Sequence, residues 1–326
     1  MTARFAALIG LSIVAFFAAI SFGAEQLAFS ELLPALLRPD GSDVLTETIL
    51  WTLRMPRALL ALLVGAGLAV AGTITQAIMR NPLAEPGILG INAGAALAAM
   101  LVIVEFPGLP AGSLQWLTFL GALIMTVAIY ALSWQQGTTS LRIILVGLGL
   151  SALAGAGASF IATFGPPVAV QRAMVWMAGT LQESRWEKVE LLAIWLTPTV
   201  ALVWLASREL NLAAFDDDIA RGLGQRVNLV RGVMVLATAA ICGAAVAAAG
   251  LVAFVGLAGP HIARRIVGHR HEVLIPAAAL TGAILVAFAD TLARSILPPI
   301  QLPVGLVTGL IGAPFFGWLL WRQRNE

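Results

Sequence analysis

The sequence is short of the residue types that disulfides, metal sites and nucleotide sites require. Its 326 residues include one cysteine and three histidines, so no intrachain disulfide can form and no Cys/His metal cage is expected. Lys188, the only lysine, is followed by Val189, so the chain contains no G-x-x-x-x-G-K-[ST] phosphate loop. The net charge of +2 is too small to indicate nucleic-acid binding. We therefore expect no resident cofactor, no metal and no nucleic-acid partner.

Charge is also scarce, and this scarcity indicates a membrane protein. Charged residues make up 11% of the chain, against about 25% in a soluble domain, and the mean hydropathy is +0.93. Apolar runs recur that are near or above the length needed to cross a bilayer. They predict an all-α protein with about ten transmembrane helices in a single domain, residues 1–326. The predicted spans are residues 5–24, 58–79, 88–104, 116–134, 143–164, 189–206, 230–249, a shorter one at 251–262, 273–297 and 304–321.

The orientation follows from the basic residues between these spans. An even number of spans places both termini on one side, and most arginines then fall on that side, which predicts cytoplasmic termini. Residues 5–24 could instead be a signal peptide, although their apolar core of about 18 residues is long for one. We favour an uncleaved first helix.

The second predicted span is the most informative stretch. Residues 58–79 carry no charge and would extend about 33 Å as a helix, enough to cross a bilayer. Gly65, Ala69 and Gly72 follow one another at three- and four-residue spacing, which lets a neighbouring helix approach closely. Gln76, one turn before the end, needs a hydrogen-bond partner or a watery cavity at that depth.

The longest polar segment is residues 207–229. Asp216, Asp217 and Asp218 lack the spaced ligands and distal glutamate of a calcium loop. They suit the N-terminus of a short helix, through capping and through the helix dipole, and Gly222 and Gly224 would end it. So short a helix buries little unless a partner covers it. The alternative is an ordinary solvated loop.

Six segments in fixed order resemble one family of membrane proteins, the permease subunits of ATP-binding-cassette importers for ferric siderophores, cobalamin and haem. The resemblance runs from about residue 50 to 320. At one position the family has glutamate and this chain has Gln301, so any salt bridge of that glutamate is absent here. The segments are RMPR at 54–57, the Gly-rich run 63–76, NPLAEPGILG at 81–90, GLAGPHIAR at 256–264, QLPVG at 301–305 and IGAPFF at 311–316.

The resemblance implies a transport subunit that is not itself an enzyme. ATP would be bound by a separate cytoplasmic ATPase dimer, and substrate would arrive on a periplasmic or lipid-anchored binding protein. The pore would form with a second permease, the same chain or a sister, in the bacterial inner membrane. Ferric siderophore is the expected cargo, with cobalamin or haem as alternatives. An ion-coupled secondary transporter remains a further alternative, and it would need ionisable residues within the spans. Only Asp290 and Arg294 qualify; they are one turn apart in the ninth predicted span, and an intrahelical ion pair between them is the other explanation.

The resemblance also assigns roles to particular residues. For Arg54, Arg57 and Arg294 the alternative role is anchoring to lipid headgroups, and for His261 it is a purely structural role. We expect binding-protein docking by Arg54, Arg57 and Arg294; ATPase coupling by Asp218, Ala220, Arg221, Leu223, Gly224, His261 and Arg264; and a gate or translocation path at Gln76, Asn81, Leu83, Thr139 and Ser140.

Overall fold

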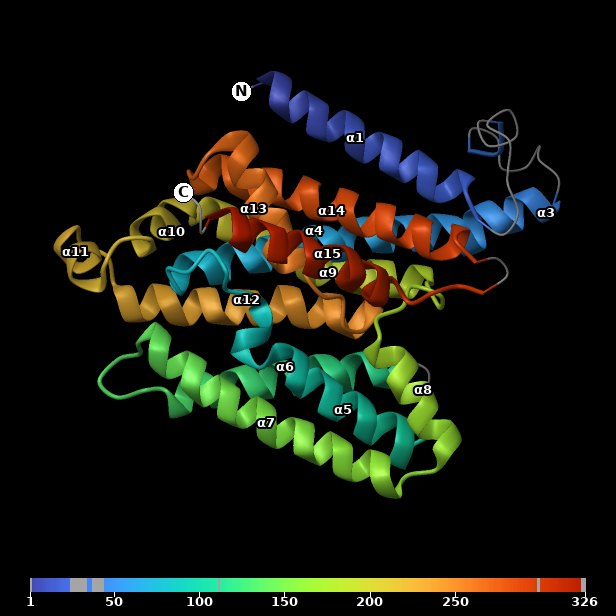
Figure 1. Ribbon diagram of the computed structural model, residues 1–326, viewed down its shortest axis with the longest axis horizontal. Coiled ribbons are helices and arrows are strands. Elements are labelled where there is room, and N and C mark those ends of the chain that lie inside the picture. The colour runs from blue at the N-terminus through green and yellow to red at the C-terminus, as the bar shows by residue number, and fades with distance from the viewer. Residues whose placement is uncertain (1, 24–33, 37–43, 111, 298–299, 324–326) are drawn as a thin grey trace.

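A computed structural model describes residues 2–23, 34–36, 44–110, 112–297 and 300–323 (Figure 1). Every regular element within those ranges is helical, as the apolar runs predict. The helices are α1 (Thr2–Ser21), α3 (Val44–Glu47), the π-helix η2 (Thr48–Arg54), α4 (Met55–Ile78), the 3₁₀-helix η3 (Pro86–Leu89), α5 (Ile91–Glu105), α6 (Ser113–Leu132), α7 (Ser140–Phe164), α8 (Pro167–Met177), α9 (Trp186–Leu205), α10 (Ser207–Ala213), α11 (Asp217–Gly222), α12 (Val227–Ala249), α13 (Val255–Val267), α14 (His271–Ser295) and α15 (Val304–Gln323).

Each predicted span coincides with one of these helices. Within the described ranges, seven helices are long and apolar enough to cross a membrane, while α5, α13 and α15 are shorter or less apolar. Most predicted starts were wrong by three or four residues, and in two cases the helix begins later than expected. The helix expected from residue 88 begins at Ile91, because η3 ends in a separate turn at Gly90 with φ of 73°. The helix expected from residue 251 begins at Val255.

Helix α4 forms the centre of the bundle and is in contact with α9, α12, α13 and α14. The predicted close approach along its small residues is confirmed. A Cβ atom added to Gly65 would lie 2.6 Å from the carbonyl carbon of Gly282 in α14. A Cβ added to Gly72 would lie 2.6 Å from the carbonyl carbon of Gly256 in α13. Backbone therefore touches backbone on two faces of α4, which is how helices associate closely in lipid.

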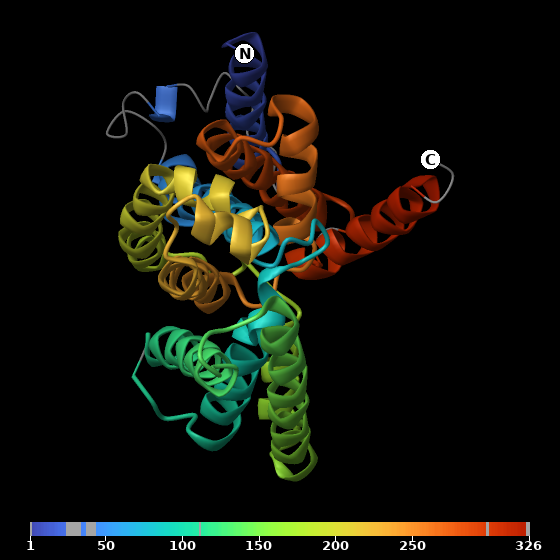
Figure 2. The same cartoon turned by 90° about the vertical axis from the view of Figure 1, so that its left-hand side faces the viewer.

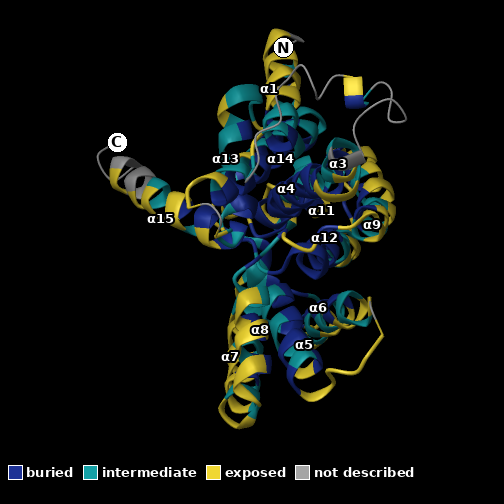
Figure 3. Ribbon diagram, turned by 90° about the vertical axis from the view of Figure 1, so that its right-hand side faces the viewer, coloured by how far each residue is buried: buried dark blue, intermediate teal, exposed yellow. Residues whose placement is uncertain are grey.

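The outer helices give the molecule its shape. Helices α5 to α8 form a second group beside α12, and α15 projects away from the bundle (Figure 2). Exposed residues cover much of α7, α9 and α15, whereas α4 and α12 are mostly buried (Figure 3). The start of α1 and the last turn of α15 lie at the same end of the bundle as α11 (Figure 1). We call this the α11 end.

Candidate functional site

The sequence-predicted residues gather at the two ends of the bundle, and the α11 loop is the first of these sites. A short helix does form where the aspartates predict it, from Asp217 to Gly222. The predicted capping is not made, since the Asp216 side chain accepts no cap hydrogen bond. The carboxylates pair with arginines instead: Asp216 with Arg80 at 2.5 Å, and Asp218 with Arg221 at 2.8 Å.

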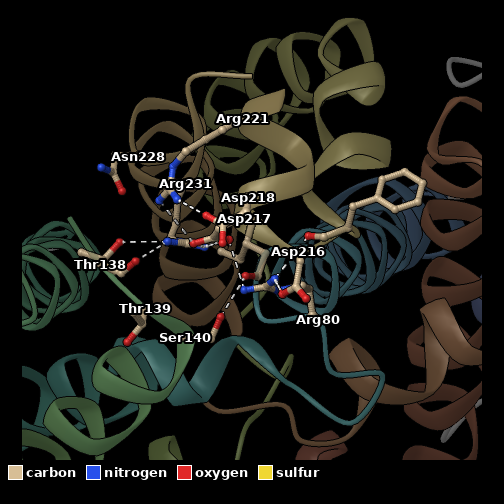
Figure 4. Close-up of polar contacts among 12 residues, drawn as sticks. Arg80, Thr138, Thr139, Ser140, Asp216, Asp217, Asp218, Arg221, Asn228 and Arg231 are labelled. Carbon is tan, nitrogen blue, oxygen red and sulfur yellow. Dashed lines mark hydrogen bonds and ion pairs between the residues drawn. The ribbon is translucent and has the colours of Figure 1, made fainter. Parts of the chain in front are cut away.

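Asp217 anchors α11 to the rest of the bundle (Figure 4). Its carboxylate accepts two hydrogen bonds from Arg231 of α12, at 2.8 and 3.0 Å, and pairs with Arg80 beyond the end of α4 at 3.1 Å. The Arg231 side chain is only 5% exposed, and it also donates to the carbonyl oxygen of Thr138. Such charge-assisted pairs are stronger when partly buried than at an open surface. They fix a six-residue helix that could not be stable alone.

The outward face of α11 is apolar. Phe215, Ile219 and Leu223, which we call the α11 patch, are 51%, 53% and 59% exposed. Ala220 on the opposite face is 1% exposed, so the helix is packed down on one side only. Gly224 then ends the segment with φ of 89° in open surroundings. A rigidly held apolar ridge at the tip of a polar loop has the features of a docking surface.

Two turns expected at the gate lie beside this anchor. The Asn81 side chain accepts a hydrogen bond from the backbone of Leu83 at 2.9 Å, which locks the turn after α4. Thr139 caps α7, and its neighbour Ser140 donates to the carbonyl oxygen of Ile78 at the end of α4. The structure thus brings the two turns together within one chain, next to Arg231 and Asp217 (Figure 4).

Gln76 has a partner for the oxygen of its side-chain amide, whereas its buried Nε2 has none among the described residues. The side chain is 4% exposed, and its Oε1 accepts a hydrogen bond from Arg264 of α13 at 2.5 Å. Arg264, expected at the ATPase surface, is therefore engaged inside the bundle. His261, one turn earlier on α13, is half-buried, and its buried Nε2 has no hydrogen-bond partner.

At the opposite end of the bundle lie the three arginines expected to dock a binding protein. The structure places them inside the protein: Arg54, Arg57 and Arg294 are 7%, 8% and 6% exposed. The expected pair between Arg294 and Asp290 is present at 3.2 Å. Arg57 donates to both oxygens of Asp290 at 2.9 to 3.1 Å and to Gln301 at 2.6 Å.

Three of the anchoring residues, Arg80, Asp217 and Arg231, belong to no motif that marks them as functional in the sequence. Nothing in the sequence links them, because Arg80 and Asp217 are far apart along the chain and meet only through the fold. Asp290 and Arg294 are one helical turn apart, so the sequence predicts that they pair, but it does not show that Arg57 shares the carboxylate. Within the described ranges, no three His, Cys, Asp or Glu residues gather as metal ligands would.

Comparisons with known proteins agree with this arrangement. The FecCD transport family matches residues 11–322. The Fe(3+)-citrate import system permease protein YfmE of Bacillus subtilis is 39% identical, over 98% of this chain and 93% of the relative. The hemin transport system permease protein HmuU of Yersinia pestis is 39% identical over 86% of each chain. A solved structure described as an inward-facing metal-chelate type ABC transporter aligns with a TM-score of 0.89 at 29% identity, over 98% of this chain and 99% of that one. The chain belongs to the FecCD transport family.

Proposed function

We propose that the chain is the permease subunit of an ATP-driven, binding-protein-dependent importer, and that its cargo is a ferric siderophore. The observation that carries this proposal is the α11 patch, an apolar ridge that Asp217 and Arg231 hold in place and that the described part of the chain leaves exposed. A cytoplasmic ATPase dimer is the partner that would cover it. Binding of ATP would then move α11 as a rigid unit and, through Arg231 and Arg80, the ends of α12 and α4.

The test is co-purification of the ATPase with the permease from membranes. Leu223→Ser together with Ile219→Ser removes the apolar ridge without touching the ion pairs. We expect the double variant to insert normally and to lose the ATPase. The matched control is Leu229→Ser, an equally exposed leucine outside the patch. Retention of the ATPase by the double variant would contradict the proposal.

The orientation follows from the same assignment. With the ATPase on α11, the α11 end is cytoplasmic, and both termini lie on that side of the bacterial inner membrane. The turns at Asn81 to Leu83 and at Thr139 to Ser140 would close the inner end of the path, because irregular backbone at membrane depth is tolerated where it lines a cavity. A second permease, the same chain or a sister, would supply the other wall.

Arg54, Arg57 and Arg294 are proposed to receive carboxylates of the binding protein at the outer end, because arginine forks bind carboxylates in a bidentate manner. Since all three are buried here, a partner carboxylate must enter the existing polar network. Arg57→Glu should slow association and reduce stimulated ATP hydrolysis, and charge reversal of a partner glutamate should recover part of the loss. Unchanged association at low salt would leave these residues as structural groups.

The cargo is proposed from the relatives, whose names include iron-citrate, iron-hydroxamate and haem systems. Haem is therefore one alternative, and cobalamin remains the other through the sequence resemblance alone. Uptake of a panel of labelled ferric chelates, haem and cobalamin by a deletion strain carrying this chain would distinguish them. A secondary transporter is disfavoured because Asp290 and Arg294 are ion-paired and so are not free to carry a coupling ion. Uptake that survives ATP depletion but stops without a proton gradient would favour a secondary transporter.

A further inference from the structure

At the end of the bundle opposite α11, one carboxylate serves two buried guanidinium groups. Asp290 on α14 has a side chain that is 1% exposed, and it is shared between Arg57 on α4 and Arg294 on its own helix. The remaining donors of these arginines are directed to neutral acceptors. Arg57 donates to the Gln301 side chain at 2.6 Å, and Arg294 donates to the carbonyl oxygen of Ala19 at 2.5 Å.

Among the described residues, this cluster therefore places at least two buried guanidinium groups on one carboxylate. Burial of an uncompensated charge is costly, and neutral acceptors offset that cost only partly. A second carboxylate would balance the network. The guanidinium groups of Arg54 and Arg294 approach each other at Gly23, where an added Cβ would lie 3.3 Å from Nη2 of Arg54 and 3.5 Å from Nη1 of Arg294. The guanidinium edges thus meet beside a residue that has no side chain.

We propose that Asp290 competes with the carboxylates of the binding protein for Arg57 and Arg294, so that docking loosens the ion pair that joins α4 to α14. The proposal rests on the docking role given to these arginines above. An arriving carboxylate that takes the N–H groups now bonded to Asp290 displaces that carboxylate, and its negative charge weakens the attraction of both arginines for Asp290. Helices α4 and α14 are in backbone contact at Gly65 and Gly282, so a change at their outer ends would be transmitted along rigid elements.

Two substitutions change this competition in opposite directions. Asp290→Asn keeps the shape but removes the competing charge, so the binding protein should dissociate more slowly, by roughly tenfold, the effect of one charge-assisted hydrogen bond. The same variant should lose the increase in ATP hydrolysis that the binding protein produces. Gln301→Glu places a second carboxylate beside Arg57, and binding should weaken by a similar factor. The matched control is Gln182→Glu, which adds the same charge at an exposed residue whose side chain donates to the backbone carbonyl of Gln301 rather than to Arg57.

The measurement is binding kinetics on the complete permease–ATPase complex in nanodiscs at low salt, with ATP hydrolysis measured with and without binding protein. Slower dissociation from Asp290→Asn and weaker binding by Gln301→Glu support the competition. Unchanged or weaker binding by Asp290→Asn overturns it, since Asp290 would then only position the arginines. If Asp290→Asn does not fold, unchanged or tighter binding by Gln301→Glu overturns the proposal by itself. Arg57→Ala and Arg294→Ala test docking separately: if neither alters association, the docking role fails as well.

Discussion

The contact between α4 and α14 gives the sharpest prediction for stability, through Gly65→Ala. The added methyl would lie 2.6 Å from the carbonyl carbon of Gly282 and 2.9 Å from the nitrogen of Ala283, both backbone atoms that cannot rotate away. Ordinary contact begins at 3.4 Å, and the carbonyl oxygen of Gly282 lies nearer still to the added methyl, so the helices must separate by more than 3.4 minus 2.6, or about 0.8 Å. Overpacking of this kind costs about 1–3 kcal/mol, and we expect the upper part of that range because backbone meets backbone. Replacing a helical glycine returns about 0.5–1 kcal/mol. The net loss should be about 1–2 kcal/mol.

The single cysteine provides the assay. Cys242 is 1% exposed and is the only thiol in the chain, so a dye that fluoresces on thiol reaction reports its exposure as the protein unfolds. Gly65→Ala should unfold several degrees below the unmodified protein at the same heating rate. The matched control is Gly10→Ala on α1, where an added Cβ meets nothing within 4 Å and a small gain is expected. An unchanged unfolding temperature for Gly65→Ala, or an equal drop for Gly10→Ala, would refute the reasoning.

Four further predictions concern the α11 end. Gly224→Val should uncouple or release the ATPase without affecting membrane insertion, because φ of 89° is strained for a β-branched residue; normal co-purification and transport would contradict this. Cysteines at Asn81 and Ser140, whose turns meet within one chain, should crosslink when the gate is closed and block transport, whereas thiol access in every nucleotide state would place the gate elsewhere. Asp217→Asn should lower the unfolding temperature and the ATPase stimulation together, because Arg231 and Arg80 lose a shared counter-ion. Asp218→Asn is the control and should change stability little, because the Asp218 side chain is 95% exposed. Burial raises the pKa of Glu85 above its usual 4.5, so the ionised carboxylate opposes folding once the pH exceeds about 4.5. Glu85→Gln should therefore raise the unfolding temperature at pH 7 and not at pH 4. An equal effect at both pH values would exclude ionisation of Glu85 as the cause.

The sequence by itself determined the membrane class, the order of the helices and the close-packed stripe on α4. These properties depend on local patterns: apolar length, the spacing of small residues, and a break such as Asn81-Pro82. The short helix after Asp216 was also predictable, because propensity and the two glycines that follow it act within a few residues. The α5 and α13 boundaries were less predictable, since a 3₁₀ turn and the positive φ of Phe254 are imposed by packing.

Only the tertiary structure decided what the charged residues do. The sequence suggested arginines facing outward, but the fold brings Asp290 and Gln301 onto Arg57, which lies 233 and 244 residues away along the chain. In the same way Asp217 finds Arg231 and Arg80, and Gln76 finds Arg264. The physical reason is that a charge buried among apolar helices must be paired, and its partner is whichever opposite group the packing brings within about 3 Å. That distance is set by the whole arrangement of helices rather than by any local stretch of sequence.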